Sequence, residues 1–185
     1  MKVVPTTLPG VVLIELVVHH DDRGHLVETF HHQRHTALGV AVGMSFVQDN
    51  LCRSRGGVVR GLHYQLTRPQ GKLVSVVRGE IFDVVLDLRP GSPTFARWFG
   101  TTLSADDRRQ LWIPPGLAHG YQALSEQADV LYKLTAPYTP DDERAVRWDD
   151  PELAITWPRL ADVVVSERDA RAPRLRDADL PRRSP

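Results

Sequence analysis

Cysteine is almost absent from this chain, since Cys52 is the only one among 185 residues. A single thiol excludes an intramolecular disulfide and a zinc site built on cysteines. It is also typical of a reducing compartment, so we expect a cytoplasmic protein. Neither sign of charge is in excess, because 23 Lys and Arg residues balance 23 Asp and Glu residues. The overall charge therefore does not attract nucleic acid or an anionic membrane, and an anionic ligand must be held by locally placed arginines.

Long hydrophobic runs are missing as well. The apolar stretch near the N-terminus, residues 11–18, contains Glu15 and is too short for a membrane span or a signal peptide. A strand is the better interpretation of this stretch. The length fits one domain, residues 1–185, with a core of its own. The last residues, 177–185, are charged and contain prolines, so we expect them to form a flexible tail.

Short runs of β-branched or alternating apolar residues recur along the chain and are separated by turn sequences such as Arg78-Gly79-Glu80. This spacing predicts an all-β fold, either an antiparallel sandwich or a barrel. Helices are expected to be few and short, one of them around residues 31–38. The predicted strands span residues 11–18, 45–52, 58–65, 72–77, 81–88, 98–103, 110–113, 119–124 and 130–135.

Histidines in a small barrel raise the question of a metal. A transition-metal site needs three or four converging donors, commonly two histidines close together on one strand. Here Gln65 stands where the second ligand beside His63 would be, and His119 is distant in sequence. The group His31, His32 and His35 has no acidic or cysteine neighbour at ligand spacing, so a solvated surface face is expected for it. The sequence therefore predicts no metal site.

Without a metal, His63 is either a core histidine or a general base whose titration range suits proton transfer near neutrality. Arg60 lies three residues before it, so the two side chains face opposite sides of a strand unless a bulge at Gly61 re-aims one of them. Lys72 opens the next predicted strand. It is a candidate to reach the same cavity and to stabilise a developing oxyanion.

Three further residues have an ordinary and a functional interpretation. Tyr132 lies on a predicted strand and could point inward, and Tyr138 follows in a loop. Buried tyrosines are usually packing residues, although an inward tyrosine opposite a histidine base would be a suitable proton donor. Asp169 cannot be placed from pattern alone, and an exposed carboxylate is its ordinary interpretation.

Ordered blocks along nearly the whole chain resemble one family, the dTDP-4-dehydrorhamnose 3,5-epimerases. The match rests on many short segments in the same order, which makes it more specific than any single motif. The blocks include Asp22-Arg23-Gly24, Glu28-Thr29-Phe30, Gln48-Asp49-Asn50, Arg60 to Gln65, Gly71 to Val74, Asp83 to Arg89, Gln110 to Pro114, Ala118-His119-Gly120, Tyr132-Lys133, Trp148 to Pro151 and Ser166 to Asp169.

This resemblance implies a cupin-type double-layered antiparallel β-barrel (jelly roll), a homodimer, and an active site without metal or cofactor. It makes His63 the base, Asp169 the carboxylate that orients it, Tyr132 the proton donor and Lys72 the group that meets the keto oxygen of the sugar. Tyr138 matches an aromatic residue that stacks on thymine. Arg168 stands where many members have lysine, and we include it among the substrate-binding residues. The other positions that match substrate contacts are Arg23, Glu28, Gln48, Asp49, Asn50, Arg60, His119 and Glu143.

The chemistry of such an isomerase fits these residue types. In a 4-keto sugar, C3 and C5 both adjoin the carbonyl, so a base can remove either proton once the enolate oxygen is stabilised. The resemblance implies inversion of both centres of dTDP-4-dehydro-6-deoxy-D-glucose to give dTDP-4-dehydro-L-rhamnose, for dTDP-L-rhamnose or a related deoxysugar. An epimerase that inverts only one centre is an alternative. A more remote alternative is a metal-dependent cupin or a non-catalytic sugar-binding barrel.

Overall fold

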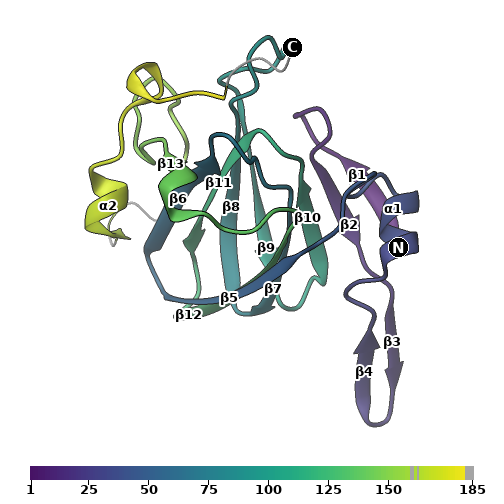
Figure 1. Cartoon of the computed structure of the whole chain (residues 1–185). Helices are drawn as coiled ribbons and strands as arrows, with labels where there is room; N and C mark the ends of the chain where they lie inside the picture. The colour runs from purple at the N-terminus through teal and green to yellow at the C-terminus, as the bar shows by residue number, and fades with distance from the viewer. Residues whose placement is uncertain (159–160, 162, 182–185) are drawn as a thin grey trace.

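Two antiparallel sheets face each other and form a flattened barrel (Figure 1). The computed structural model describes residues 1–158, 161 and 163–181. The first sheet has the order β1 (Lys2–Pro5), β2 (Val12–Glu15), β10 (Arg109–Ile113), β7 (Lys72–Arg78), β12 (Gln127–Leu134) and β5 (Gln48–Arg55). The second has the order β13 (Glu143–Ala145), β6 (Val58–Gln65), β11 (Leu117–Ala123), β8 (Glu80–Asp87) and β9 (Trp98–Ser104), and β14 (Val164–Val165) runs parallel to β6. The predicted double-layered jelly-roll barrel is confirmed.

Alternation of side chains along the strands explains why these two layers pack together. On β7, Val74 and Val76 point into the barrel, where they join Ile81 and Val85 of β8 in one buried cluster. Side chains of opposite parity face outward and are covered by other parts of the chain. The segment that contains α1 (His32–Ala37) covers the first sheet, and the C-terminal segment around Trp157 covers the second.

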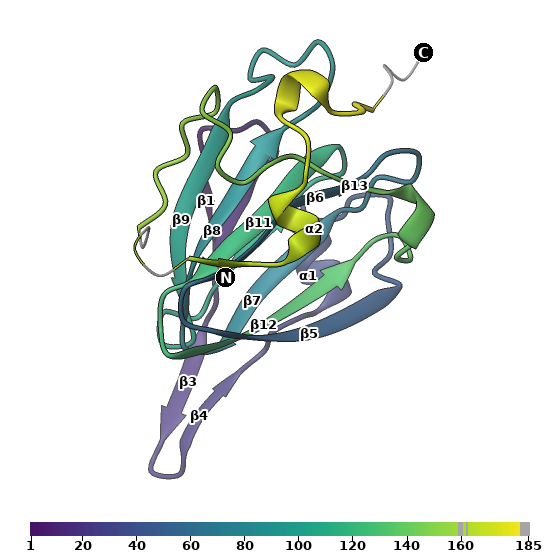
Figure 2. The ribbon, with the colours of Figure 1, turned by 90° about the vertical axis from the view of Figure 1, so that its left-hand side faces the viewer.

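Most of the predicted strands are present, and the predicted helix near residue 31 corresponds to α1. The predicted strand over residues 11–18 divides: β2 stays in the barrel, whereas β3 (Val18–Asp21) pairs with β4 (Gly24–Val27) in a separate hairpin. The hairpin projects from the barrel (Figure 2). It is rich in polar residues, so it has little apolar surface to bury against the sheets. Short elements absent from the sequence prediction are β1, β4, β13, β14, α2 (Glu167–Ala170), η1 (Pro140–Asp142) and η2 (Leu175–Asp177).

The expectation of a solvated histidine face is wrong for His35. Its ring is 1% exposed and packs against Phe30. Its Nε2 lies 3.2 Å from Oε1 of Gln110, and its Nδ1 lies 3.2 Å from the backbone nitrogen of His31. Hydrogen bonds from within the helix and from the sheet therefore satisfy this histidine, which sequence spacing alone could not show.

The predicted tail lies partly outside the described residues, which end at residue 181. Its described part contacts the barrel through Asp179. The hydroxyl of Tyr64 donates to the carbonyl oxygen of Asp179, and the carboxylate of Asp179 lies 3.3 Å from Nε of Arg144.

A β-bulge at Gly61 changes the register of β6. His119 and Tyr121 of β11 pair with His63 and Arg60, so two steps along β11 correspond to three along β6. Arg60 and His63 therefore both point into the barrel, which is the re-aiming that a bulge at Gly61 was expected to produce. Gly61 has φ +112°, and a Cβ on it would lie 2.6 Å from Cα of Gly120. Only glycine fits here without movement of the backbone.

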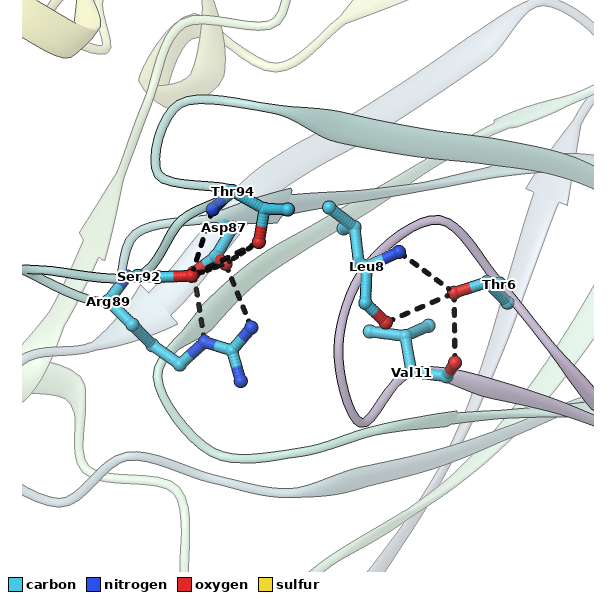
Figure 3. Close-up of polar contacts among 7 residues, drawn as sticks. All are labelled: Thr6, Leu8, Val11, Asp87, Arg89, Ser92 and Thr94. Carbon is cyan, nitrogen blue, oxygen red and sulfur yellow. Dashed lines mark hydrogen bonds and ion pairs between the residues drawn. The ribbon is translucent and has the colours of Figure 1, made fainter.

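Two groups of polar side-chain contacts order loops of the barrel, one around Asp87 and one around Thr6 (Figure 3). Burial alone would raise the pKa of Asp87, but hydrogen bonds from Arg89, Thr94 and Ser92 outweigh it and hold this pKa well below its usual range. In the turn between β1 and β2, the Thr6 hydroxyl lies 2.8 Å from the carbonyl oxygen of Val11. These side chains satisfy loop groups that would otherwise be left unpaired.

The bulge predicts a large effect of Gly61→Ala. The added methyl group must displace the backbone of β11 and also occupies a strained φ, so we expect the free energy of unfolding to fall by about 3 kcal/mol. Gly39→Ala is the matched control, because Gly39 has φ +85° but a Cβ on it would meet nothing within 4 Å; it should cost about 1 kcal/mol. Urea denaturation of both variants measures the difference, and equal losses would contradict this account of the bulge.

Candidate active site

A histidine and a carboxylate from distant parts of the chain form the centre of the site. Nε2 of His63 lies 2.6 Å from Oδ1 of Asp169. An ionised carboxylate only accepts hydrogen bonds, so Nε2 carries the proton and Nδ1 is the basic nitrogen of the neutral ring. Asp169 is 3% exposed, so the ordinary expectation of an exposed carboxylate does not hold. Pattern alone could not place this residue, whereas the resemblance expects it beside His63, and the fold brings the two together.

The short helix α2 and the bulge hold Asp169 in place. Ser166 caps α2 and accepts from the backbone N–H of Asp169 at 3.1 Å, and the N–H of Gly61 donates to Oδ2 at 3.3 Å. Burial would raise the pKa of Asp169, but the hydrogen bond from His63 and these further contacts outweigh it and lower this pKa. The carboxylate is therefore ionised at neutral pH and can stabilise positive charge on the His63 ring.

Lys72 reaches across the barrel from the first sheet to the second. Its Nζ donates to the carbonyl oxygen of His63 at 3.3 Å, and its side chain is buried. Burial lowers the pKa of Lys72 from 10.5 to about 8, although the negative charges of Glu143 and Asp83 act in the opposite direction. At neutral pH the ammonium group is mostly charged and poorly solvated, so it can stabilise an oxyanion strongly.

Tyr132 faces the histidine from the opposite sheet. It lies on β12, next to Asn50 of β5, and its hydroxyl hydrogen-bonds to the Asn50 side chain. Burial raises the pKa of Tyr132 above its usual value, and the hydrogen bond to Asn50 opposes this only in part. The phenol therefore keeps its proton at neutral pH and can donate it.

A cavity of about 270 Å³ opens beside Lys72 and Tyr132, and a set of polar contacts frames it. The Tyr138 hydroxyl donates to Oε2 of Glu143 at 2.9 Å, and Arg168 forms an ion pair with the same oxygen. The backbone N–H of Tyr138 donates to Oε1 of Gln48 at 2.8 Å. The residues that line the cavity are Asn50, Gln70, Lys72, Tyr132, Leu134, Tyr138, Glu143 and Arg168.

Two more of the predicted residues lie on the same inner surface. Nε of Arg60 donates to Oγ of Ser54 at 3.0 Å across the barrel. His119 is paired in register with His63, so the two rings project side by side from neighbouring strands. The bulge is the reason that Arg60 shares this surface.

Three predicted substrate-binding residues are not brought to the cavity within this chain. Asp49 lies on the outer face of β5, where its carboxylate pairs with Nζ of Lys133 at 2.7 Å. Arg23 pairs with Asp21 at the tip of the hairpin. Glu28, which follows the hairpin, pairs with Arg34 of α1. For Asp49 the cause is the alternation of a strand, because its neighbours on either side point inward.

Sequence reasoning missed two polar residues of the interior. Gln70 lines the cavity from the loop before β7. Asp83 is fully buried on the inner face of β8, between Ile81 and Val85. A carboxylate on the apolar face of a predicted strand was a signal that could have identified Asp83.

The described residues offer neither a metal cluster nor a membrane-spanning helix. No three His, Cys, Asp or Glu side chains among them are close enough together to hold a metal ion. No helix within residues 1–158, 161 and 163–181 has the length and apolar character needed to cross a bilayer.

A jelly-roll barrel with a His–Asp pair, a buried lysine and an inward tyrosine has the kinds of group that acid–base catalysis uses. The family model described as dTDP-4-dehydrorhamnose 3,5-epimerase matches residues 5–177. A protein of that name from Pseudomonas aeruginosa is 49% identical over 97% of this chain and 98% of its own length.

Solved structures agree with this match. An epimerase from Legionella pneumophila, in complex with dTDP-4-keto-L-rhamnose, superposes with a TM-score of 0.95 at 45% identity and covers 100% of this chain and 99% of its own. A 3'-monoepimerase from Streptomyces bikiniensis, in complex with dTDP-quinovose, has a TM-score of 0.86 at 34% identity, covering 93% and 87%. The chain belongs to the dTDP-4-dehydrorhamnose 3,5-epimerase family and is an isomerase.

Burial of Lys72 predicts that the free energy of unfolding changes with pH in the alkaline range. Between pH 8 and 10.5 the unfolded chain still binds a proton that the folded chain has lost, so the folded state gains stability as the pH rises. Relative to Lys72→Met, the wild type should gain roughly 3 kcal/mol over this range and nothing below it. Urea denaturation at a series of pH values measures the difference. Lys2→Met, which removes an exposed lysine, controls for loss of charge, and a pH-independent difference for Lys72→Met would contradict the prediction.

Proposed function

We propose that this enzyme inverts C3 and C5 of dTDP-4-dehydro-6-deoxy-D-glucose and gives dTDP-4-dehydro-L-rhamnose, with His63 as base and Tyr132 as acid. The observation that carries this proposal is the placement of the two groups on the inner faces of the two opposite sheets of the barrel, His63 on β6 and Tyr132 on β12. Inversion at carbon requires that a proton leaves from one face and returns to the other. A base and an acid on facing walls meet this requirement.

The steps follow from the states of the side chains. Nδ1 of His63 takes a proton from the carbon beside the ketone, and Asp169 stabilises the positive charge that forms on the ring. The electron pair moves to the keto oxygen, where the ammonium group of Lys72 stabilises the enolate. Tyr132 then returns a proton from the other side. His63 then gives its proton to solvent and Tyr132 takes one from solvent, which restores both groups. The same sequence at the second carbon completes the reaction, and rotation of the sugar in the cavity would present each carbon in turn.

The nucleotide half of the substrate needs positive charge and an aromatic surface. Arg60 and Arg168 offer guanidinium groups that suit phosphate oxygens. Tyr138 is 42% exposed at the entrance, where its ring is open to stacking with thymine. The reaction transfers only protons, and Lys72 supplies the charge that a metal would supply elsewhere, so the proposal includes neither a metal nor a cofactor. We place the reaction in the cytoplasm, in accord with the single cysteine.

The hairpin β3–β4 supports a homodimer in which one chain completes the site of the other. Arg23 and Glu28 match substrate-contacting positions of the family, yet within their own chain they pair with Asp21 and Arg34. The hairpin itself projects away from the barrel (Figure 1). The hairpin also carries Leu26, which is 72% exposed, and Val17 beside it is 50% exposed. Exposed apolar side chains on a projecting element fit an interface with a second copy.

The proposed double inversion predicts exchange with solvent at two carbons. Wild-type enzyme incubated with substrate in deuterated water should place deuterium at both C3 and C5, as located by NMR. His63→Ala should abolish the exchange and leave binding of dTDP intact. Tyr132→Phe should retain some exchange but lose inversion, because the base still acts while the donor is missing.

Label at only one of these carbons would show a single-centre epimerase, the activity named for the Streptomyces bikiniensis relative. Normal turnover by His63→Ala would exclude His63 as the base, and normal inversion by Tyr132→Phe would assign the donor to another group. Bound iron, zinc or manganese at one equivalent, with activity lost on chelation, would favour a metal-dependent barrel.

The proposed dimer predicts complementation between two inactive variants. Arg23→Ala lacks the hairpin contact, and His63→Ala lacks the base. Unfolding and refolding the two together should restore part of the activity, because each mixed dimer contains one site with both groups intact. The same procedure applied to each variant alone is the control. No recovery from a mixture whose dimers are demonstrated by sedimentation would show that the hairpin does not act on the partner.

A further inference from the structure

Asp83 is a buried carboxylate to which the mechanism above gives no role. It lies on β8 opposite Tyr121 of β11, and its side chain is completely shielded from solvent. Ile81 and Val85, on either side of it along the strand, belong to the apolar cluster of the barrel. An ionised group in such surroundings is costly unless it is paired.

Only one of the two Asp83 oxygens has a hydrogen-bond partner in the part of the chain that the structure describes. Oδ2 lies 2.8 Å from Nε2 of His119, whereas Oδ1 is buried without a partner. A structural carboxylate is normally saturated with donors, as Asp87 is on the same strand. The hydrogen bonds of Asp83 are therefore not those of a carboxylate that only stabilises the fold.

The first consequence of this arrangement concerns His119. Because the carboxylate only accepts, Nε2 of His119 carries a proton, and Nδ1 is the nitrogen that the protein leaves available. The geometry repeats that of the neighbouring pair, in which Asp169 holds Nε2 of His63. The two rings are in register on adjacent strands, so the barrel holds two His–Asp pairs side by side.

The second consequence concerns Lys72. Its ammonium group enters the same interior from the opposite sheet, and the negative charge of Asp83 acts on it there. Other charged or titratable groups also surround Lys72, each from a different element. They are His63 on β6, Tyr132 on β12, Glu143 on β13 and Arg168 on α2, with Tyr138 in the loop before η1. His119 on β11 is linked to this group through its hydrogen bond with Asp83.

We propose that Asp83 is a positioning residue of the epimerisation: it fixes the ring of His119 and keeps Lys72 in its ammonium form where the enolate oxygen develops. The inference rests on the proposed function, which assigns the enolate to Lys72. In this scheme Asp83 does not touch the substrate or the reacting atoms. It acts through His119 and Lys72, which do. The negative charge balances Lys72 in the free enzyme, and the enolate adds a second anion on the accessible side of the same ammonium group.

The test is Asp83→Asn in the full-length protein. The amide has nearly the shape of the carboxylate and can still accept from Nε2 of His119, but it has no charge. Without that charge the pKa of Lys72 falls below its present value of about 8. Because Lys72 acts as an ammonium group, kcat should decrease at alkaline pH as Lys72 loses its proton. In the variant this alkaline limb of the pH profile of kcat should therefore move to lower pH. At neutral pH kcat should fall about 10-fold, less than the loss of an oxyanion-stabilising group would cost, because Glu143 still acts on Lys72. The affinity for dTDP should stay unchanged.

Asp150→Asn is the matched control. Asp150 is also a buried carboxylate, but it accepts from the backbone N–H groups of Glu152 and Leu175 outside the barrel interior. Its loss should lower stability without moving the alkaline limb. A folded Asp83→Asn enzyme with an unmoved limb and normal kcat would overturn the inference. If wild-type enzyme assayed in parallel has no epimerase activity, the proposed function fails instead.

A second measurement does not depend on the variant folding. In wild-type protein labelled with ¹⁵N, the ring of His119, assigned by comparison with His119→Gln, should show a hydrogen-bonded proton on Nε2 at neutral pH. A His119 ring protonated on Nδ1 alone would overturn the inference, whether or not the enzyme is active.

Discussion

The close approach of β6 to β11 at Gly61 and Gly120 is the constraint on which the whole site depends. Because neither residue has a side chain, the two backbones come close enough for β6 to accommodate one extra residue. This extra residue turns Arg60 inward together with His63. It also directs the N–H of Gly61 at Asp169. One local irregularity thus aligns the base, the carboxylate that orients it and an arginine on the inner wall.

Charges of both signs meet inside the barrel. The first sheet contributes the ammonium group of Lys72, and the second contributes the histidines together with Asp83. Glu143 lies on β13, the edge strand of the second sheet, and Asp169 lies on α2, which packs against β6. Buried ions are tolerated only when each lies near an opposite charge or a strong donor. Asp169, Asp83 and Glu143 meet this condition through His63, His119 and Arg168, so the ammonium group of Lys72 can accept one more anion.

Local sequence predicted the architecture well, because alternation and turn residues are local signals. Strand positions made Lys72 a candidate, but they left His63 and Tyr132 with a packing interpretation beside the functional one, and the resemblance to the family decided their roles. Local sequence could not bring Asp169 to His63, since a contact between residues this far apart depends on how the C-terminal segment folds over β6. Strand parity explains why Asp49 lies on the outer face although Gln48 and Asn50 point inward. The burial of His35 depends on α1 docking on the first sheet, which spacing within the helix does not indicate.

Stability and chemistry are linked through the apolar interior. Along β7, Lys72 is followed on the same face by Val74 and Val76, and along β12, Tyr132 follows Val130. The valines join the two sheets and stabilise the fold. They also exclude water from the cavity floor, and this desolvation lowers the pKa of Lys72 to about 8 and raises that of Tyr132. Replacing these valines by polar residues would weaken the core. It would also return the pKa values of Lys72 and Tyr132 toward those of the free side chains in water. The packing that holds the barrel together therefore also sets the acid–base properties of the site.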